Sequence, residues 1–134
     1  MAGSKSDYLE DAILDHVLGD TAYTAPGTVY IALFTVAPTD AGGGTEVTDG
    51  SYARKAVTNN ATQWPAASGG AKSNGEDIEF AQATGDWGTC VAFAIFDALT
   101  AGNMLYWADL ETSKAVNSGD TAKFSAGDLD VTED

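Results

Sequence analysis

Cysteine, histidine and positive charge are scarce in this chain of 134 residues, which has one cysteine, one histidine and six lysines and arginines. A zinc site needs several cysteine or histidine ligands, so the sequence excludes structural or catalytic zinc. Cys90 has no partner for an internal disulfide, and its apolar neighbours indicate a small buried side chain. We expect no metal centre and no cofactor.

The six cations stand against 20 aspartates and glutamates, which gives a net charge of -14. DNA and anionic membranes are bound by clustered cations, and the average field of this chain repels both. We therefore expect no direct binding to nucleic acid or to membranes. No apolar run has the length of a membrane span, and the N-terminus has no signal-peptide core. The sequence predicts a protein that is made in the cytoplasm of a host cell.

Motifs for enzyme chemistry are also lacking. His16 would be the base of any serine hydrolase, yet no serine stands in a Gly-x-Ser-x-Gly pattern. The run Gly42–Gly44 continues with Thr45 rather than with the Gly-Lys-Ser/Thr ending of a phosphate-binding loop. An acidic chain must place some carboxylates in pairs, as glycoside cleavage requires, but most of its acids are solvated. The sequence predicts that the protein is not an enzyme and has no catalytic residue.

Two smaller binding hypotheses stay open. Trp64, Trp87 and Trp107 would stack on sugar rings if they were exposed, although the tryptophans of a β domain usually belong to its core. The acidic stretches Asp40–Asp49 and Asp128–Asp134 are candidates for a weak cation site. Neither stretch has the spacing of a dedicated calcium loop.

The sequence predicts a helix over residues 6–18. Ser6 is placed to cap this helix, and Gly19 is placed to end it in a left-handed conformation. Its apolar residues recur every three or four positions and form one face: Leu9, Ile13, Leu14, Val17 and Leu18. We expect this face to cover one side of a β-sheet.

Runs at 28–36 and 89–97 are apolar on both alternating faces, which is typical of strands covered on both sides. The second run and a strand at 104–110 are expected to form a hairpin around the turn Ala101-Gly102-Asn103. Shorter strands are expected at 52–58, 77–81, 122–125 and 129–132. Long loops are expected at 37–50 and 59–75, and the first is interpreted as a flexible arm.

Together these elements predict a single domain over residues 1–134. Its fold is predicted to be mainly β, an antiparallel β-sandwich of the jelly-roll or Ig-like kind with about six to eight strands. One N-terminal α-helix precedes the strands.

From about Asp7 to Val131 the chain resembles a small virion protein found in many tailed bacteriophages. The similar stretches, in chain order, are LEDAILDHVLG, TAYTAPGTVYIALFTVAPTDAGGGTEV, SYARKAV, DWGTCVAFAIFDA, GNMLYWADL and VNSGDTAKFSAGDLDV. The most specific pieces are YIALFTVAPTDAGGGTEV, YARKAV, WGT followed by IFDA, and LYW. Members of this family are often labelled tail fibre proteins or hypothetical structural proteins. The resemblance implies a virion structural protein and brings no catalytic residues with it.

Two roles in a virion follow as expectations. The first is a capsid decoration or cement protein that binds between major capsid subunits as a homo-oligomer, with a trimer favoured. The second is a tail component, whether a fibre, an adaptor or a module that binds host glycans. The expected partners are the major capsid protein or other virion proteins.

Three groups of residues are candidates for the interface with such a partner. Tyr52, Arg54 and Lys55 combine an aromatic ring with the only paired cations of the chain, and tyrosine and arginine are enriched at interfaces. An exposed edge strand with ordinary charges explains these three residues equally well. The other candidates are the loop residues Pro38, Thr39 and Asp40 and the helix residues Leu9 and Ile13.

Overall fold

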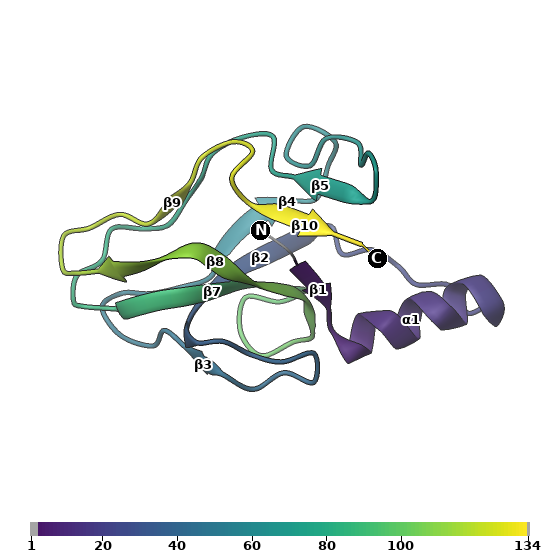
Figure 1. The fold of residues 1–134 in the computed structure, drawn as a ribbon, viewed down its shortest axis with the longest axis horizontal. Coiled ribbons are helices and arrows are strands. Elements are labelled where there is room, and N and C mark those ends of the chain that lie inside the picture. Colours follow the sequence, from purple (N-terminus) through teal and green to yellow (C-terminus); the bar gives the residue numbers. More distant parts are fainter. Residues whose placement is uncertain (1–2, 134) are drawn as a thin grey trace.

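The computed structural model, which describes residues 3–133, shows a mainly β protein with one helix near its N-terminus (Figure 1). The helix is α1 (Asp7–Leu18). The strands of the main antiparallel sheet are β1 (Gly3–Lys5), β8 (Met104–Val116), β7 (Gly88–Phe96), β2 (Thr28–Val36) and β3 (Thr45–Glu46), in that order, with β4 (Lys55–Thr58) also paired to β2. Two short antiparallel ribbons complete the fold: β5 (Ala71–Ser73) with β10 (Asp130–Thr132), and β6 (Ile78–Glu79) with β9 (Lys123–Phe124).

The centre of the main sheet is the pairing of β2 with β7 and of β7 with β8. Ile31 lies opposite Ile95, and Leu33 lies opposite Phe93. The expected hairpin between β7 and β8 is confirmed, and Ala101 and Gly102 both take positive φ values in its turn, 52° and 73°. β8 is longer than expected because its last residues, up to Val116, continue to pair with the start of β7.

One face of the main sheet packs against a second layer. In Figure 1, β5, β9 and β10 lie on the same side of the long strands. Core residues of the sheet such as Ile31 and Phe93 belong to one cluster with Ile78, Phe80 and Leu129 from the second layer. This confirms the mainly β antiparallel fold and fits a sandwich, but the second layer consists of two short ribbons and their loops.

The opposite face of the main sheet is also apolar and is lined by Ala32, Phe34, Ala92, Ala94 and Met104. The Phe34 and Phe96 rings stack on this side with centroids 6.4 Å apart. Residues 37–44 lie along this face, where the Trp107 Nε1 donates to the Asp40 carboxylate at 2.8 Å.

The loop at 37–50 is therefore not a free arm. The Asp7 amide donates to the Asp40 carbonyl at 2.8 Å, and the Val47 amide donates to the Leu33 carbonyl at 3.0 Å. The loop also contains β3, a short strand that the sequence did not indicate. Its glycines supply the turns: Gly44 has a φ of 72°, and a Cβ there would meet the Val36 carbonyl oxygen at 2.5 Å.

Helix α1 begins as expected and ends differently. The Ser6 hydroxyl accepts from the Leu9 amide at 3.2 Å and donates to the Met104 carbonyl, so it ties the helix start to β8. At the other end, Gly19 has an extended φ of -155°, and Asp20 takes the positive value, 54°. The Thr21 amide closes this end by donating to the Asp15 carbonyl at 3.0 Å.

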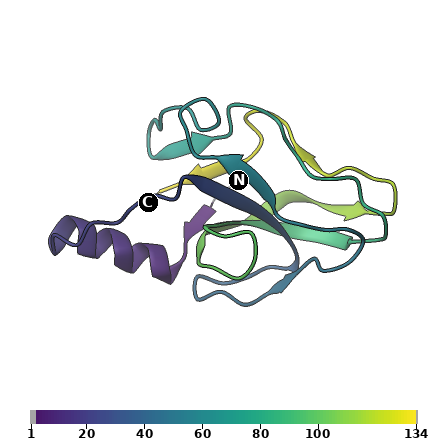
Figure 2. The same cartoon turned by 180° about the vertical axis from the view of Figure 1, so that it is seen from behind.

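The expectation that α1 covers a face of the sheet is wrong. Only Leu9 is buried on this helix, and both views show α1 extending away from the sheets (Figures 1 and 2). One face of the sheet is covered instead by the ribbons and their loops, which bring Ile78, Phe80 and Leu129 onto it. Three short strands were also missed, because β1, β3 and β5 have two or three residues each and lie beside glycines.

Replacing the buried capping serine tests how α1 is attached. We expect Ser6→Ala to lower the free energy of unfolding by about 1–2 kcal/mol, because it removes the cap and leaves the Leu9 amide without its acceptor. The measurement is unfolding in urea, monitored by circular dichroism. The control is Ser118→Ala at an exposed loop position, which should stay within about 0.5 kcal/mol of the parent. Equal stability of the two variants would contradict this role.

Candidate functional site

The predicted interface residue Arg54 lies in a network inside its own chain. Its Nε and Nη2 donate to the two carboxylate oxygens of Glu46, each at 2.9 Å. Its Nη1 donates to the carbonyls of Ala98 and Ala101 at 2.9 and 2.8 Å. The guanidinium also lies 3.7 Å from the centre of the Phe96 ring, and its side chain is 7% exposed. Arg54 thus joins three segments: the 37–50 loop, the β7–β8 turn and the approach to β4.

Tyr52 extends this network toward the core. Its hydroxyl accepts from the Leu33 amide at 3.0 Å and donates to Glu46 at 2.7 Å. Its ring meets Trp87 edge to face, with centroids 5.2 Å apart. Burial raises the pKa of Tyr52 well above its ordinary value of 10.0, and the hydrogen bond to Glu46 raises it further.

Of the three residues predicted together, Lys55 alone is exposed on its strand. The structure separates it from the other two, because Tyr52 and Arg54 both turn toward Glu46. A contact of these residues with a partner stays a prediction. The pairing with Glu46 has no signal in the sequence, since it depends on β3, which the sequence did not indicate.

The loop candidates lie near the start of α1. Pro38 is buried, Thr39 is exposed, and Asp40 is partly buried beside Trp107. The structure brings the carboxylates of Asp7, Glu10 and Asp40 to within 4.8 Å of one another. Carboxylates are stabilised at the N-terminus of a helix by its dipole, which accounts for two of them without a cation.

The other acidic stretch is dispersed. Glu133 forms an ion pair with Lys5, Asp128 and Asp130 lie at either side of the buried Leu129, and Asp134 is outside the described residues. No cluster of potential ligands was found in that stretch within residues 3–133.

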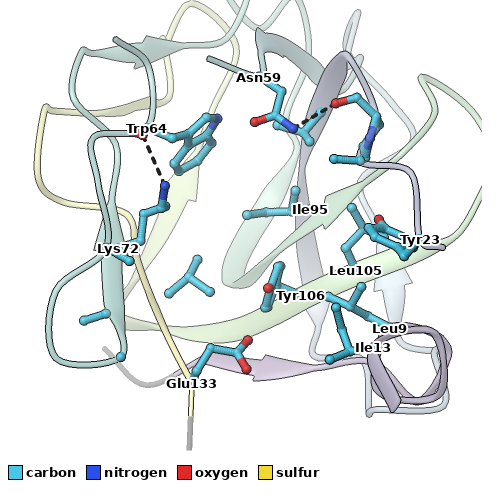
Figure 3. A pocket seen from close by; sticks show the side chains of 17 residues that line it. Leu9, Ile13, Tyr23, Asn59, Trp64, Lys72, Ile95, Leu105, Tyr106 and Glu133 are labelled. Atoms are coloured by element: carbon cyan, nitrogen blue, oxygen red, sulfur yellow. Dashed lines mark hydrogen bonds between the residues drawn. The ribbon is translucent and has the colours of Figure 1, made fainter. Parts of the chain in front are cut away.

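The helix candidates Leu9 and Ile13 line an apolar cavity of about 360 Å³. It lies between α1, the β5–β10 ribbon and the main sheet, and Figure 3 shows Leu9 and Ile13 across from Trp64 and Lys72. Apolar side chains from both layers complete its walls: Val29, Ala71, Ile95, Leu105 and Val131. The size and lining match a site that binds an apolar group.

Two polar side chains at this cavity, those of Lys72 and Asn59, already bond other groups of the chain. The Lys72 ammonium donates to the Trp64 carbonyl at 3.3 Å, and the Asn59 amide donates to the Pro26 carbonyl at 2.8 Å (Figure 3). Burial raises the pKa of Tyr106, and the charge of Glu133 raises it further. The cavity therefore offers a largely apolar surface with its few polar groups held at the edge.

The three tryptophans are part of the core rather than an open platform for sugars. Trp64 and Trp87 are buried, and Trp107 is partly buried. Trp87 donates through Nε1 to the Gly50 carbonyl at 2.9 Å. The buried Nε1 of Trp64 makes no hydrogen bond within the described part of the chain.

The single cysteine and the single histidine of the chain both have positions within the packed structure. Cys90 is 1% exposed, as expected of a core residue, and burial raises the pKa of its thiol. The Nδ1 of His16 accepts from the Tyr23 amide at 3.1 Å, which gives this side chain a structural role. Within residues 3–133, no helix is long and apolar enough to span a bilayer.

A protein-family model described as podophage GP4 fiber I protein gp80 matches residues 4–132. The match begins in β1 and ends in β10, so it includes α1 and all the long strands of the main sheet. No curated protein matches the chain.

Substitution of Arg54 tests the network that joins the loops. We expect Arg54→Lys to lower the free energy of unfolding by roughly 2–3 kcal/mol, because lysine keeps the charge but cannot bond Glu46, Ala98 and Ala101 together. The matched control is Lys55→Arg on the neighbouring exposed residue, with a change within about 0.5 kcal/mol. Denaturant unfolding measures both, and a stable Arg54→Lys variant would overturn the assignment.

The raised pKa values of Tyr52 and Tyr106 predict a loss of stability in alkali. Above about pH 10 the unfolded chain releases the tyrosine protons while the folded chain keeps them, so the free energy of unfolding falls as pH rises. Unfolding measured from about pH 9 to about pH 11.5 should show this slope. Tyr52→Phe should reduce the slope, and adding Tyr106→Phe should reduce it further. An unchanged slope in the double variant would refute the prediction.

Proposed function

The chain belongs to the Gp80 family, whose description is podophage GP4 fiber I protein gp80, and from this premise we propose that it is a fibre component of a phage virion. That it is a virion structural protein of a bacteriophage follows from the family itself. The observation that carries the finer proposal is the match over residues 4–132, nearly the whole chain. The family description favours the tail component of the two expected roles over a capsid decoration protein.

We propose a role in structure and attachment rather than in catalysis. The proposal is supported by how the residues are used: Cys90 is buried, His16 accepts a backbone amide, and Arg54 bonds its own chain. A fibre subunit must keep its shape under load while it is held at a few points, and the Arg54 network serves the first of these needs by tying loops to the sheet.

The proposed partners are other virion proteins and further copies of the chain, with a trimer as the expected assembly. Fibre subunits combine through closed symmetric interfaces when they form discrete assemblies. We propose no direct contact with DNA or with membranes, because the net charge of -14 opposes both. Binding of host glycans is not favoured, since the tryptophans are used in the core.

The test is the copy number and place of the protein in purified particles. We expect quantitative mass spectrometry to find it in virions at less than about one tenth of the copies of the major capsid protein, as symmetry at a tail or vertex requires. Immunogold electron microscopy should place it on fibres. A copy number near that of the capsid protein, with label over the whole head, would show a decoration protein instead, and absence from particles would exclude both roles.

A further inference from the structure

Helix α1 leaves most of its apolar face without a covering. The apolar stripe of α1 consists of Leu9, Ile13, Leu14, Val17 and Leu18. Leu9 is buried and Ile13 is partly buried, whereas the last three residues are open to solvent. The exposed fractions are 56% for Leu14, 67% for Val17 and 80% for Leu18. A helix of this length is marginal by itself, since most helical stability in proteins comes from packing of the apolar face. A second molecule that covered this stripe would complete the packing.

The open stripe continues into the apolar cavity beside it. Leu9 and Ile13 belong both to the stripe and to the cavity wall, which is completed by the β5–β10 ribbon (Figure 3). Figures 1 and 2 show the far end of α1 beyond the body of the protein, where it can be reached without moving the sheets. Contiguous exposed apolar surfaces of this kind mark sites of protein interaction.

The charged side chains of α1 and of the residues that follow it have one sign. Helix α1 carries Asp7, Glu10, Asp11 and Asp15, Asp20 follows it, and no lysine or arginine occurs anywhere from residue 6 to residue 53. Asp11 and Asp15 are exposed on the turns that lead to the open end. The exposed end is the C-terminal one, where the helix dipole adds further negative potential.

A second copy of the chain is a poor match for this surface. It brings the same net charge of -14, and three of its six cations already pair with acids of their own chain: Lys5 with Glu133, Arg54 with Glu46 and Lys123 with Asp77. Like charges that face each other across an interface are unfavourable, whereas opposite charges steer association and fix its register. The complementary partner is therefore basic.

We propose that the outer half of α1, with the mouth of the adjacent cavity, is the surface by which this protein attaches to a different virion protein, one that presents an apolar surface flanked by lysine or arginine. This inference rests on the proposed role in the virion. The apolar side chains Leu14, Val17 and Leu18 supply the buried centre of the contact, and Asp11 and Asp15 supply its charged rim.

The experiment uses phage particles that lack this protein and are supplied with it in trans. The apolar variant is Leu14→Gln, Val17→Gln and Leu18→Gln, which keeps good helix formers at the helix positions. Its control is Val36→Thr with Leu99→Gln, at two other exposed apolar residues (56% and 51% exposed) away from α1. The charge variant is Asp11→Asn with Asp15→Asn, and its control is Asp109→Asn with Asp128→Asn at exposed positions. Thermal unfolding by circular dichroism verifies that each variant is folded.

We expect the apolar variant to reduce the copies per particle by about tenfold or more and the charge variant to reduce them by about threefold. Both controls should remain within about twofold of the parent. Binding of the purified protein to the same particles should weaken between about 50 and about 500 mM NaCl, and less so for the charge variant.

The outcomes separate the two proposals. If the parent protein does not enter particles, the proposed function fails. If the parent enters and both α1 variants enter equally well, or if binding strengthens with salt, the attachment surface is wrong while the function stands. Sedimentation velocity measures whether the isolated parent protein and the apolar variant assemble with further copies of themselves. If the apolar variant breaks up an assembly of the parent chain, the stripe binds a second copy and the proposed basic partner is excluded.

Discussion

The long strands β2 and β7 carry apolar side chains on both faces, and the rest of the structure is arranged to keep water from both. On one face the ribbons β5–β10 and β6–β9 bring Ile78, Phe80 and Leu129 onto the sheet. On the other face the 37–44 segment lies along the sheet beside Phe34 and Trp107. A loop held in this position needs polar attachments as well as apolar contact, because its backbone groups cannot all pair within a ladder.

Arg54 and Tyr52 provide these attachments through one carboxylate. Glu46 accepts from both side chains, while Arg54 reaches the β7–β8 turn and Tyr52 reaches the backbone of β2. These bonds add to the attachments made by Asp40, which accepts from the Trp107 side chain and from the Asp7 amide. Negative charge predominates on the surface, because acids outnumber cations and Lys5, Arg54 and Lys123 are each paired with an acid.

Helix α1 differs from much of this surface because it exposes apolar side chains. Its first turn is tied to β8 through Ser6, and its last turn exposes leucine and valine between aspartates. In the proposed attachment, the end of α1 that is tied to β8 fixes the helix to the sheet, and the exposed end carries the apolar and acidic side chains that a basic partner would contact.

The chain's own pattern was enough to predict the mainly β class, the helix with its serine cap, the two long strands and the β7–β8 hairpin, because each depends on neighbours along the sequence. The same is true of the buried Cys90. The virion family was also predicted, from stretches spread over nearly the whole chain.

Tertiary structure alone decided how these pieces are used. The bond from Arg54 to Glu46, the position of the 37–50 loop on the sheet and the open end of α1 all depend on segments that are distant in sequence. Alternation and capping signals describe what each segment prefers, and they carry no information about which segment will cover it. Whether an apolar helix face is buried depends on which segments reach the sheet in space, and here the ribbons and their loops occupy the face that α1 leaves open.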